Sequence, residues 1–139
     1  MGNGKLAQQA SRLSGQYVGE GNREGWLSLF ALDAIVQDPV GVSPLDPTGA
    51  GFKGRDAIAG FWDMMIAPGT VRFDIHHSHP AGDECANVIT VQNILPDGLE
   101  IIIDMVVVYT ANAEGKISSL KAYWEFDRIQ QQLDAVKAN

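Results

Sequence analysis

The chain has 139 residues, of which 45% are hydrophobic and 19% are charged. This length is typical of one domain, spanning 1–139, whose core is large enough to enclose an apolar ligand. The formal net charge is −7, and lysine and arginine together number only 10. Because no basic run or aromatic-interleaved basic patch is present, nucleic acids and anionic membranes are excluded as favoured partners. An acidic surface also repels anions, so the composition favours a small neutral molecule as the partner.

Cys85 is the single cysteine of the chain, so no intramolecular disulfide can form. We expect it to be a small buried strand residue, not a reactive thiol. The N-terminal residues lack the apolar core of a signal peptide, and no stretch approaches the ~18 apolar residues that cross a bilayer. The sequence therefore predicts a cytoplasmic protein with no membrane-spanning segment.

Apolar residues at helical spacing predict three helices in the first half of the chain. The first helix covers about 5–18 and ends at a group of glycines. The second carries Trp26 on its apolar side. The third begins at Gly54-Arg55 and ends near Pro68-Gly69, because glycine and proline interrupt the helical pattern there.

Strands are predicted where apolar and polar residues alternate. A short strand over 34–37 ends at Asp38, because Pro39 disfavours helix at the residue before it. Residues 42–53 are rich in glycine and proline and indicate a loop. After the third helix the period changes to two, which predicts strands over 71–76, 85–95, 99–110 and 116–127, before a helix over 128–137. Helices followed by antiparallel strands indicate an α+β fold, in which a curved antiparallel sheet closes against the three N-terminal helices.

One stretch carries the clearest chemical signal. Residues 26–41 read WLSLFALDAIVQDPVG, where a helix end and a short strand deliver Asp38 into an Asp-Pro-Val-Gly turn. This stretch, together with Lys53-Gly54-Arg55, Phe61-Trp62 and Ala122-Tyr123-Trp124, resembles the Δ5-3-ketosteroid isomerases. That family belongs to the nuclear transport factor 2-like, or SnoaL-like, superfamily. The resemblance implies a cone-shaped α+β barrel and a homodimer formed through the outer face of the sheet.

Asp38 falls on the catalytic base of the resembled family, with the same flanking Pro-Val-Gly. The resemblance implies that this carboxylate removes an allylic proton beside a ketone and returns it two carbons along. Because one carboxylate serves both steps, no cofactor is implied. An apolar environment raises the basicity of such a carboxylate. Read from the residues alone, an aspartate before a proline also fits a turn-forming role.

The resemblance also implies two hydrogen-bond donors for the enolate oxygen, where negative charge develops. The two corresponding positions are Ser14 and Val107. Tyr17 lies three residues after Ser14, roughly 4.5 Å further along the same helix, and we expect Tyr17 or Trp62 to act as the donor. The alternative for Tyr17 is a core aromatic. Asp104 is an odd number of residues from Val107, so we expect it to point outward or into an interface.

Aromatic and sulfur-containing side chains are expected to form an apolar wall around the ligand. Trp62 aligns with a pocket tyrosine of the family and Trp124 with a pocket aromatic, so either indole can stack on a flat molecule or donate a hydrogen bond. The rest of the wall is expected from Phe30, Phe61 and Met65. Trp26 is assigned to ordinary core packing.

The histidines His76, His77 and His79 invite a metal interpretation. Zinc needs further ligands, and no second cluster or HExxH-type motif is present, so we predict no metal. In a regular strand His77 and His79 continue the face of Ile75, while His76 points away. A surface or pore-rim role is the one that we favour.

The leading hypothesis is a steroid Δ-isomerase-like enzyme that transfers an allylic proton on a hydrophobic 3-oxo-Δ5 ketone, with Asp38 as general base. One alternative is a non-catalytic binder of steroid-like rings, suggested by the serine and valine at the two donor positions. The other is a different cyclase or hydrolase reaction on a SnoaL-like scaffold. The residues leave these alternatives open.

Overall fold

A computed structural model describes residues 2–137, within which the chain forms α-helices, one π-helix and a sheet. The elements are α1 (Gly4–Glu20), α2 (Arg23–Ser28), β1 (Phe30–Gln37), β2 (Phe52–Lys53), α3 (Arg55–Phe61), η1 (Trp62–Ile66), β3 (Thr70–Ala81), β4 (Glu84–Ile94), β5 (Glu100–Ala111), β6 (Ile117–Tyr123) and α4 (Asp127–Lys137). The predicted α+β order is confirmed, and the third predicted helix is divided into α3 and the π-helical η1. No helix in the described range has the length and apolar character needed to cross a membrane.

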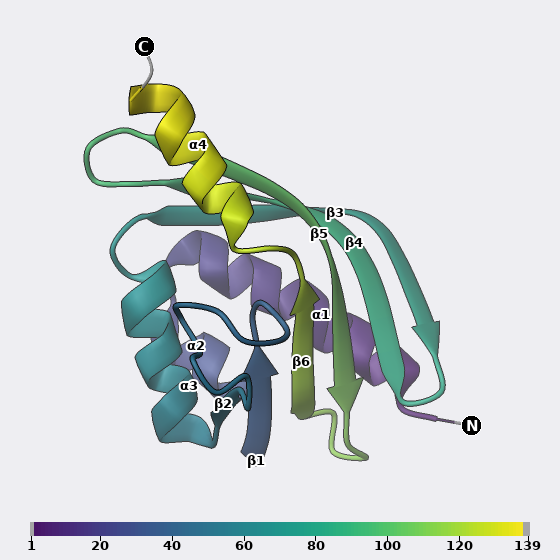
Figure 1. Cartoon of the computed structure of the whole chain (residues 1–139). Coiled ribbons are helices and arrows are strands. Elements are labelled where there is room, and N and C mark those ends of the chain that lie inside the picture. The colour runs from purple at the N-terminus through teal and green to yellow at the C-terminus, as the bar shows by residue number, and fades with distance from the viewer. Residues whose placement is uncertain (1, 138–139) are drawn as a thin grey trace.

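The strands form one curved, six-stranded sheet in the order β2-β1-β6-β5-β4-β3. Strands β3 to β6 pair in antiparallel fashion as predicted, but β1 runs parallel to β6. Two parallel strands need a long connection between them. Between β1 and β6 this connection contains β2, α3 and three long strands. The sheet stays open, with β2, inside the predicted loop 42–53, at one edge. Figure 1 shows β3 to β5 bending over α1, which gives the fold a cone-like interior.

Helix α1 lies across the concave side of the sheet, and its buried face carries small residues. Ala7, Ser11, Ser14 and Val18 are buried and recur at three- and four-residue spacing. Ser11 accepts a hydrogen bond from Nδ2 of the buried Asn87 over 2.8 Å, which fastens the helix to β4. This close packing brings Ser14 and Val18 to the interior of the cone.

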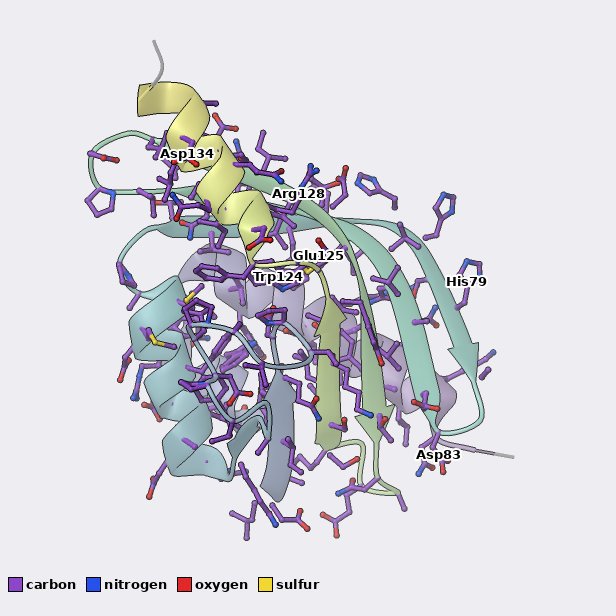
Figure 2. All side chains as sticks on the ribbon, viewed as in Figure 1. His79, Asp83, Trp124, Glu125, Arg128 and Asp134 are labelled. Atoms are coloured by element: carbon purple, nitrogen blue, oxygen red, sulfur yellow. The ribbon has the colours of Figure 1, made fainter. Side chains whose placement is uncertain are left out.

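A β-bulge at His76 shifts the register of β3 against β4, between Ile75 and His77. One extra residue reverses the alternation of side chains, so His77 lies opposite the exposed Val88. The prediction that His77 and His79 continue the face of Ile75 is therefore wrong. Both are exposed, their rings stack with centroids 6.3 Å apart, and Figure 2 shows His79 pointing away from the fold.

Apolar side chains are exposed on the outer face of the sheet. This face is defined by Val88, Ile102, Val106 and Tyr123, which are 38%, 47%, 38% and 48% exposed. The homodimer implied by the family resemblance stays a prediction, and the outer face is the surface that we expect it to use. The inward-facing side chains of β5 are covered by the core, and its outward-facing side chains would then be covered by a second copy of the chain.

Val106→Lys places a charge in the middle of the outer face, and we expect it to convert a dimer to a monomer because an unpaired buried charge is costly. Size-exclusion chromatography with light scattering measures the mass of each species. Val42→Lys, at a 75% exposed loop position, is the matched control and should remain dimeric. A monomeric wild type, or a Val106→Lys variant that stays dimeric, would contradict this prediction.

Candidate functional site

A cavity of about 130 Å³ lies inside the cone, between α1, η1 and the concave side of the sheet. Its wall is mostly apolar, and β3, β4 and β5 contribute Val71, Phe73, Ile89, Val91, Ile103 and Met105. The carboxyl, hydroxyl and amide side chains that line it are Ser14, Asp38, Asn93 and Tyr109. Interactions among a few polar groups inside an apolar wall are stronger than the same interactions in water.

The end of β1 positions Asp38. Ala34 and Val36 are buried on the inner side of β1, and Asp38 continues the same alternation into the cavity. Beyond it, the Asp38-Pro39 peptide is cis, and the Val40 N–H donates to the carbonyl of Ala122 over 2.9 Å. That backbone bond ties the turn to β6 and holds the half-buried carboxylate beside the strand end.

Trp124 follows the end of β6, where the chain leads into α4 (Figure 2), and its indole N–H donates to Asp38 Oδ1 over 2.5 Å. Burial raises the pKa of Asp38 from 3.8 to about 6, because removal from water disfavours the charged form, while the Trp124 hydrogen bond acts in the opposite direction. The carboxylate is therefore more basic than an ordinary aspartate and still ionises near neutral pH. Both properties suit a general base.

Ser14 lies at the centre of a second polar group in the cavity wall. It accepts a hydrogen bond from Trp26 Nε1 over 3.0 Å and one from the Tyr109 hydroxyl over 3.3 Å. The hydroxyl hydrogen of Ser14 is used in neither bond, so it remains available to a ligand oxygen. Burial raises the pKa of Tyr109. The hydrogen bond to Ser14 lowers this pKa and the nearby charge of Asp38 raises it, but burial is the largest effect. The phenol therefore stays protonated.

Six of the nine site residues expected from the sequence line this cavity: Asp38, Ser14, Phe61, Met65, Val107 and Trp124. They come from both halves of the chain, and the fold brings them together. Asp104 lies on the outer face, as expected, and accepts a hydrogen bond from Thr90 over 2.6 Å. Within residues 2–137, no three His, Cys, Asp or Glu side chains are grouped as metal ligands.

The structure places Tyr17, Phe30 and Trp62 outside the cavity-lining set. Tyr17 lies about 100° around α1 from Val18, which faces the cavity, so its ring packs at the edge of the core. Phe30 is fully buried with its ring centroid 4.6 Å from that of Trp26. Trp62 is buried with its ring centroid 5.3 Å from that of Trp26, and it lines an adjoining cavity instead of this one. Among the expected donor positions, Ser14 lines this cavity, whereas Tyr17 and Trp62 do not.

Sequence reasoning missed Tyr109 and assigned Trp26 to packing alone. Tyr109 lies two residues after Val107, and residues two apart on a strand share a face. That signal was available once Val107 was placed in the pocket. Trp26 does pack in the core, but its N–H bond to Ser14 could not be read from spacing, because the two residues meet only after α1 and α2 pack together.

Asp38→Asn tests the raised pKa of Asp38 through stability. The folded state holds this proton more tightly than the unfolded chain, so unfolding free energy falls as pH rises from about 4 to about 6 and then stays level. The ionised carboxylate costs up to about 3 kcal/mol above that range and nothing below it. Asp38→Asn should therefore be more stable than wild type near pH 8, with a gap that shrinks near pH 4, as measured by urea unfolding.

Asp33→Asn is the matched control for this measurement, because Asp33 is exposed on the same strand. Its stability difference from wild type should be small at every pH. A gap for Asp38→Asn that stays constant across pH would contradict the assignment.

Comparison with known proteins gives one family and a set of similar structures. The model of the SnoaL-like domain matches residues 15–120. Δ5-3-ketosteroid isomerase from Mycobacterium sp. is similar, with a TM-score of 0.84 and 33% identity over 88% of this chain and 95% of that one. A Mycobacterium tuberculosis protein in complex with estradiol-17β-hemisuccinate has a TM-score of 0.84 and 32% identity over 88% and 96% of the two chains. A computationally designed 17-OHP binder has a TM-score of 0.84 and 32% identity over 88% and 94%.

Proposed function

The chain belongs to the SnoaL-like domain family, and from that membership we propose that it is a steroid Δ-isomerase-like enzyme. Its substrate is a hydrophobic ketone of the 3-oxo-Δ5 steroid class. The observation that carries this proposal is the pairing of Asp38, with a pKa of about 6, and the free hydroxyl hydrogen of Ser14 in one apolar cavity. A base and an oxyanion donor are the two groups that enolisation needs.

The proposed reaction moves one proton between two carbons of the substrate. Asp38 takes the proton from the carbon between the ketone and the double bond, and the C–H electron pair moves toward the ketone oxygen. Ser14 donates its hydroxyl hydrogen bond to that oxygen while it carries negative charge. Asp38 then returns the proton two carbons along, and the double bond ends conjugated with the ketone. The same carboxylate acts in both steps, so its charge is restored at the end of the cycle.

Trp26 and Tyr109 both donate hydrogen bonds to the proposed donor, Ser14. A hydroxyl that accepts two hydrogen bonds becomes a stronger donor, because each bond polarises the next. Both groups are fixed by the fold before the substrate binds: Trp26 is 2% exposed and Tyr109 is 3% exposed. Preorganised donors in a water-poor cavity stabilise an oxyanion better than water does. In this proposal, the arrangement lets Ser14 act as the donor at the first of the two donor positions that the resemblance implies.

The substrate class follows from the wall and from the relatives. Phe61, Met65 and Trp124 present apolar and aromatic surface to the cavity, which suits a flat ring system. Similar structures include a ketosteroid isomerase, a complex with an estradiol ester and a designed 17-OHP binder. The net charge of −7 also disfavours an anionic substrate.

Conversion of a Δ5-3-ketosteroid to its Δ4 isomer by the purified protein tests the proposal directly. Asp38→Asn should lower kcat by about 10²–10⁴-fold or more, because the amide cannot accept the proton. Asp33→Asn should behave like wild type. The absence of turnover in wild type, or equal rates for wild type and Asp38→Asn, would rule out the proposed isomerase activity.

Ser14→Ala removes the proposed oxyanion donor and should lower kcat by about 10²–10³-fold with a small effect on KM. Tyr109→Phe should have a smaller effect, because Tyr109 acts through Ser14. Tyr17→Phe is the matched control, since Tyr17 lies on the same helix outside the cavity-lining set, and its kcat should be unchanged. Steady-state kinetics on the same substrate gives all three values, and a loss confined to Tyr17→Phe would reverse the assignment of the donor.

A second function is supported by the donor set itself. Among the cavity-lining residues, Ser14 is the one side chain with a free hydroxyl hydrogen, whereas the resembled family uses two donors. A cavity with this wall and one donor suits a non-catalytic steroid binder. Tight binding of a ketosteroid without turnover, and without an effect of Asp38→Asn, would favour this function over the isomerase.

A further inference from the structure

The cavity that Asp38 lines is smaller than the ligand of the proposed reaction. Its volume is about 130 Å³. An apolar cavity of roughly 150 Å³ holds one benzene ring, and pockets for drug-sized ligands have roughly 300–1,000 Å³. A steroid has four fused rings, so the first ring fills this cavity and the others extend toward the open end of the cone. Part of the wall must therefore move when a steroid binds.

Most of the wall is held firmly by the fold. Strands β3, β4 and β5 are joined by hydrogen-bond ladders along their length. Helix α1 is fastened to β4 through Ser11 and to β5 through Ser14. Next to η1, the ring of Phe61 stacks on that of Trp26 with centroids 6.4 Å apart. Moving any of these parts breaks contacts within the core.

Helix α4 is attached differently. Of its described side chains, Ile129 alone lines the cavity, and Leu133, one turn further on the same face, packs at the edge of the core. Both side chains are half-buried. Figure 1 shows the far end of α4 projecting beyond the sheet. The helix therefore covers the open end of the cone through a small apolar contact.

Gln132 fastens α4 to the edge of β5. The last residue of β6, Tyr123, pairs with Val106, so β6 does not pair with the earlier part of β5. There, Oε1 of Gln132 accepts a hydrogen bond from the Ile102 N–H over 2.8 Å, and Nε2 donates to the Ile102 carbonyl over 2.7 Å. Ile102 is exposed, so water replaces both partners when the helix leaves. Separation therefore has a modest cost.

A hinge between β6 and α4 would leave the base undisturbed. The indole of Trp124 is bonded to Asp38, which fixes the start of the connection. The N–H of Arg128 donates to the carbonyl of Glu125 over 3.0 Å, so the first helical turn begins at Glu125. Rotation of the backbone between Trp124 and Glu125 moves α4 as a unit, while Asp38 keeps its partner.

We propose that α4 is a displaceable lid that competes with the ligand for the open end of the cone, with Gln132 as its latch. The inference rests on the proposed function, since it takes the ligand to be a steroid. The first ring binds in the cavity that Asp38 and Ser14 line. The remaining rings take the space of Ile129, and α4 swings outward as the bonds of Gln132 to β5 break. The structure described above is the closed state.

Removal of the latch should improve binding. Gln132→Ala should bind androst-4-ene-3,17-dione about tenfold more tightly than wild type, because the ligand no longer has to break the two bonds to Ile102. This steroid already has the Δ4 double bond, so it is not turned over, and quenching of tryptophan fluorescence gives each Kd. Gln131→Ala, at the exposed neighbouring position of the same helix, is the matched control and should bind as wild type does. A loss of folding does not imitate a gain in affinity.

Hydrogen exchange at Ile102 reports the position of the lid. In the closed state Gln132 protects the Ile102 amide, whereas the Ile103 amide faces β4 by the alternation of an antiparallel strand. Saturation of wild type with androst-4-ene-3,17-dione should raise the exchange rate of the Ile102 amide by about tenfold or more and leave that of Ile103 unchanged. Nuclear magnetic resonance measures both rates.

Equal or weaker binding by Gln132→Ala overturns the lid, as does the same gain in Gln131→Ala. An Ile102 amide that exchanges no faster in the complex also overturns it. Any of these results together with Δ5 to Δ4 turnover leaves the proposed function standing and removes this inference. Tighter binding by Gln132→Ala without turnover supports the lid and removes the isomerase. If the steroid binds neither to wild type nor to Gln132→Ala, both fall.

Discussion

The site depends on how the fold holds the end of β1 beside the end of β6. Parallel pairing of these strands brings Asp38, one residue beyond β1, next to Trp124, one residue beyond β6. The backbone bond from Val40 to Ala122 closes the same junction. In an ordinary surface turn, water would keep the pKa of this carboxylate low. Here the cone surrounds it with apolar side chains, and its basicity follows from that removal from water.

Small residues on α1 make the second half of the site possible. Because Ser11 and Ser14 are short, the helix approaches the sheet closely enough for hydrogen bonds to reach Asn87 and Tyr109. The same packing that stabilises the fold thus places the Ser14 hydroxyl in the cavity that Asp38 also lines. The Ser14 hydroxyl is on a helix, and the Tyr109 phenol that donates to it is on a central strand, so regular elements hold both. Such placement suits a site whose groups must be preorganised.

Local periodicity predicted most elements of this fold, because alternation and helical spacing record which face is buried. The same reasoning failed at His76, where one extra residue in β3 turned His77 and His79 to the outside. A bulge leaves no mark in the alternation until the partner strand is known. Tyr17 was misplaced for a related reason: spacing identifies a shared helix face, but the rotation of α1 against the sheet decides which residues at its edge enter the cavity.

The sequence by itself determined the α+β order, the turn that carries Asp38 and the apolar character of the wall, because each of these lies in short stretches with their own periodicity. Tertiary structure decided the parallel pairing of β1 with β6, the contact of Trp124 with Asp38, and the meeting of Trp26, Ser14 and Tyr109. These contacts join residues 12 to 95 positions apart. Their partners are chosen by how whole layers pack, and no local pattern along the chain records that choice.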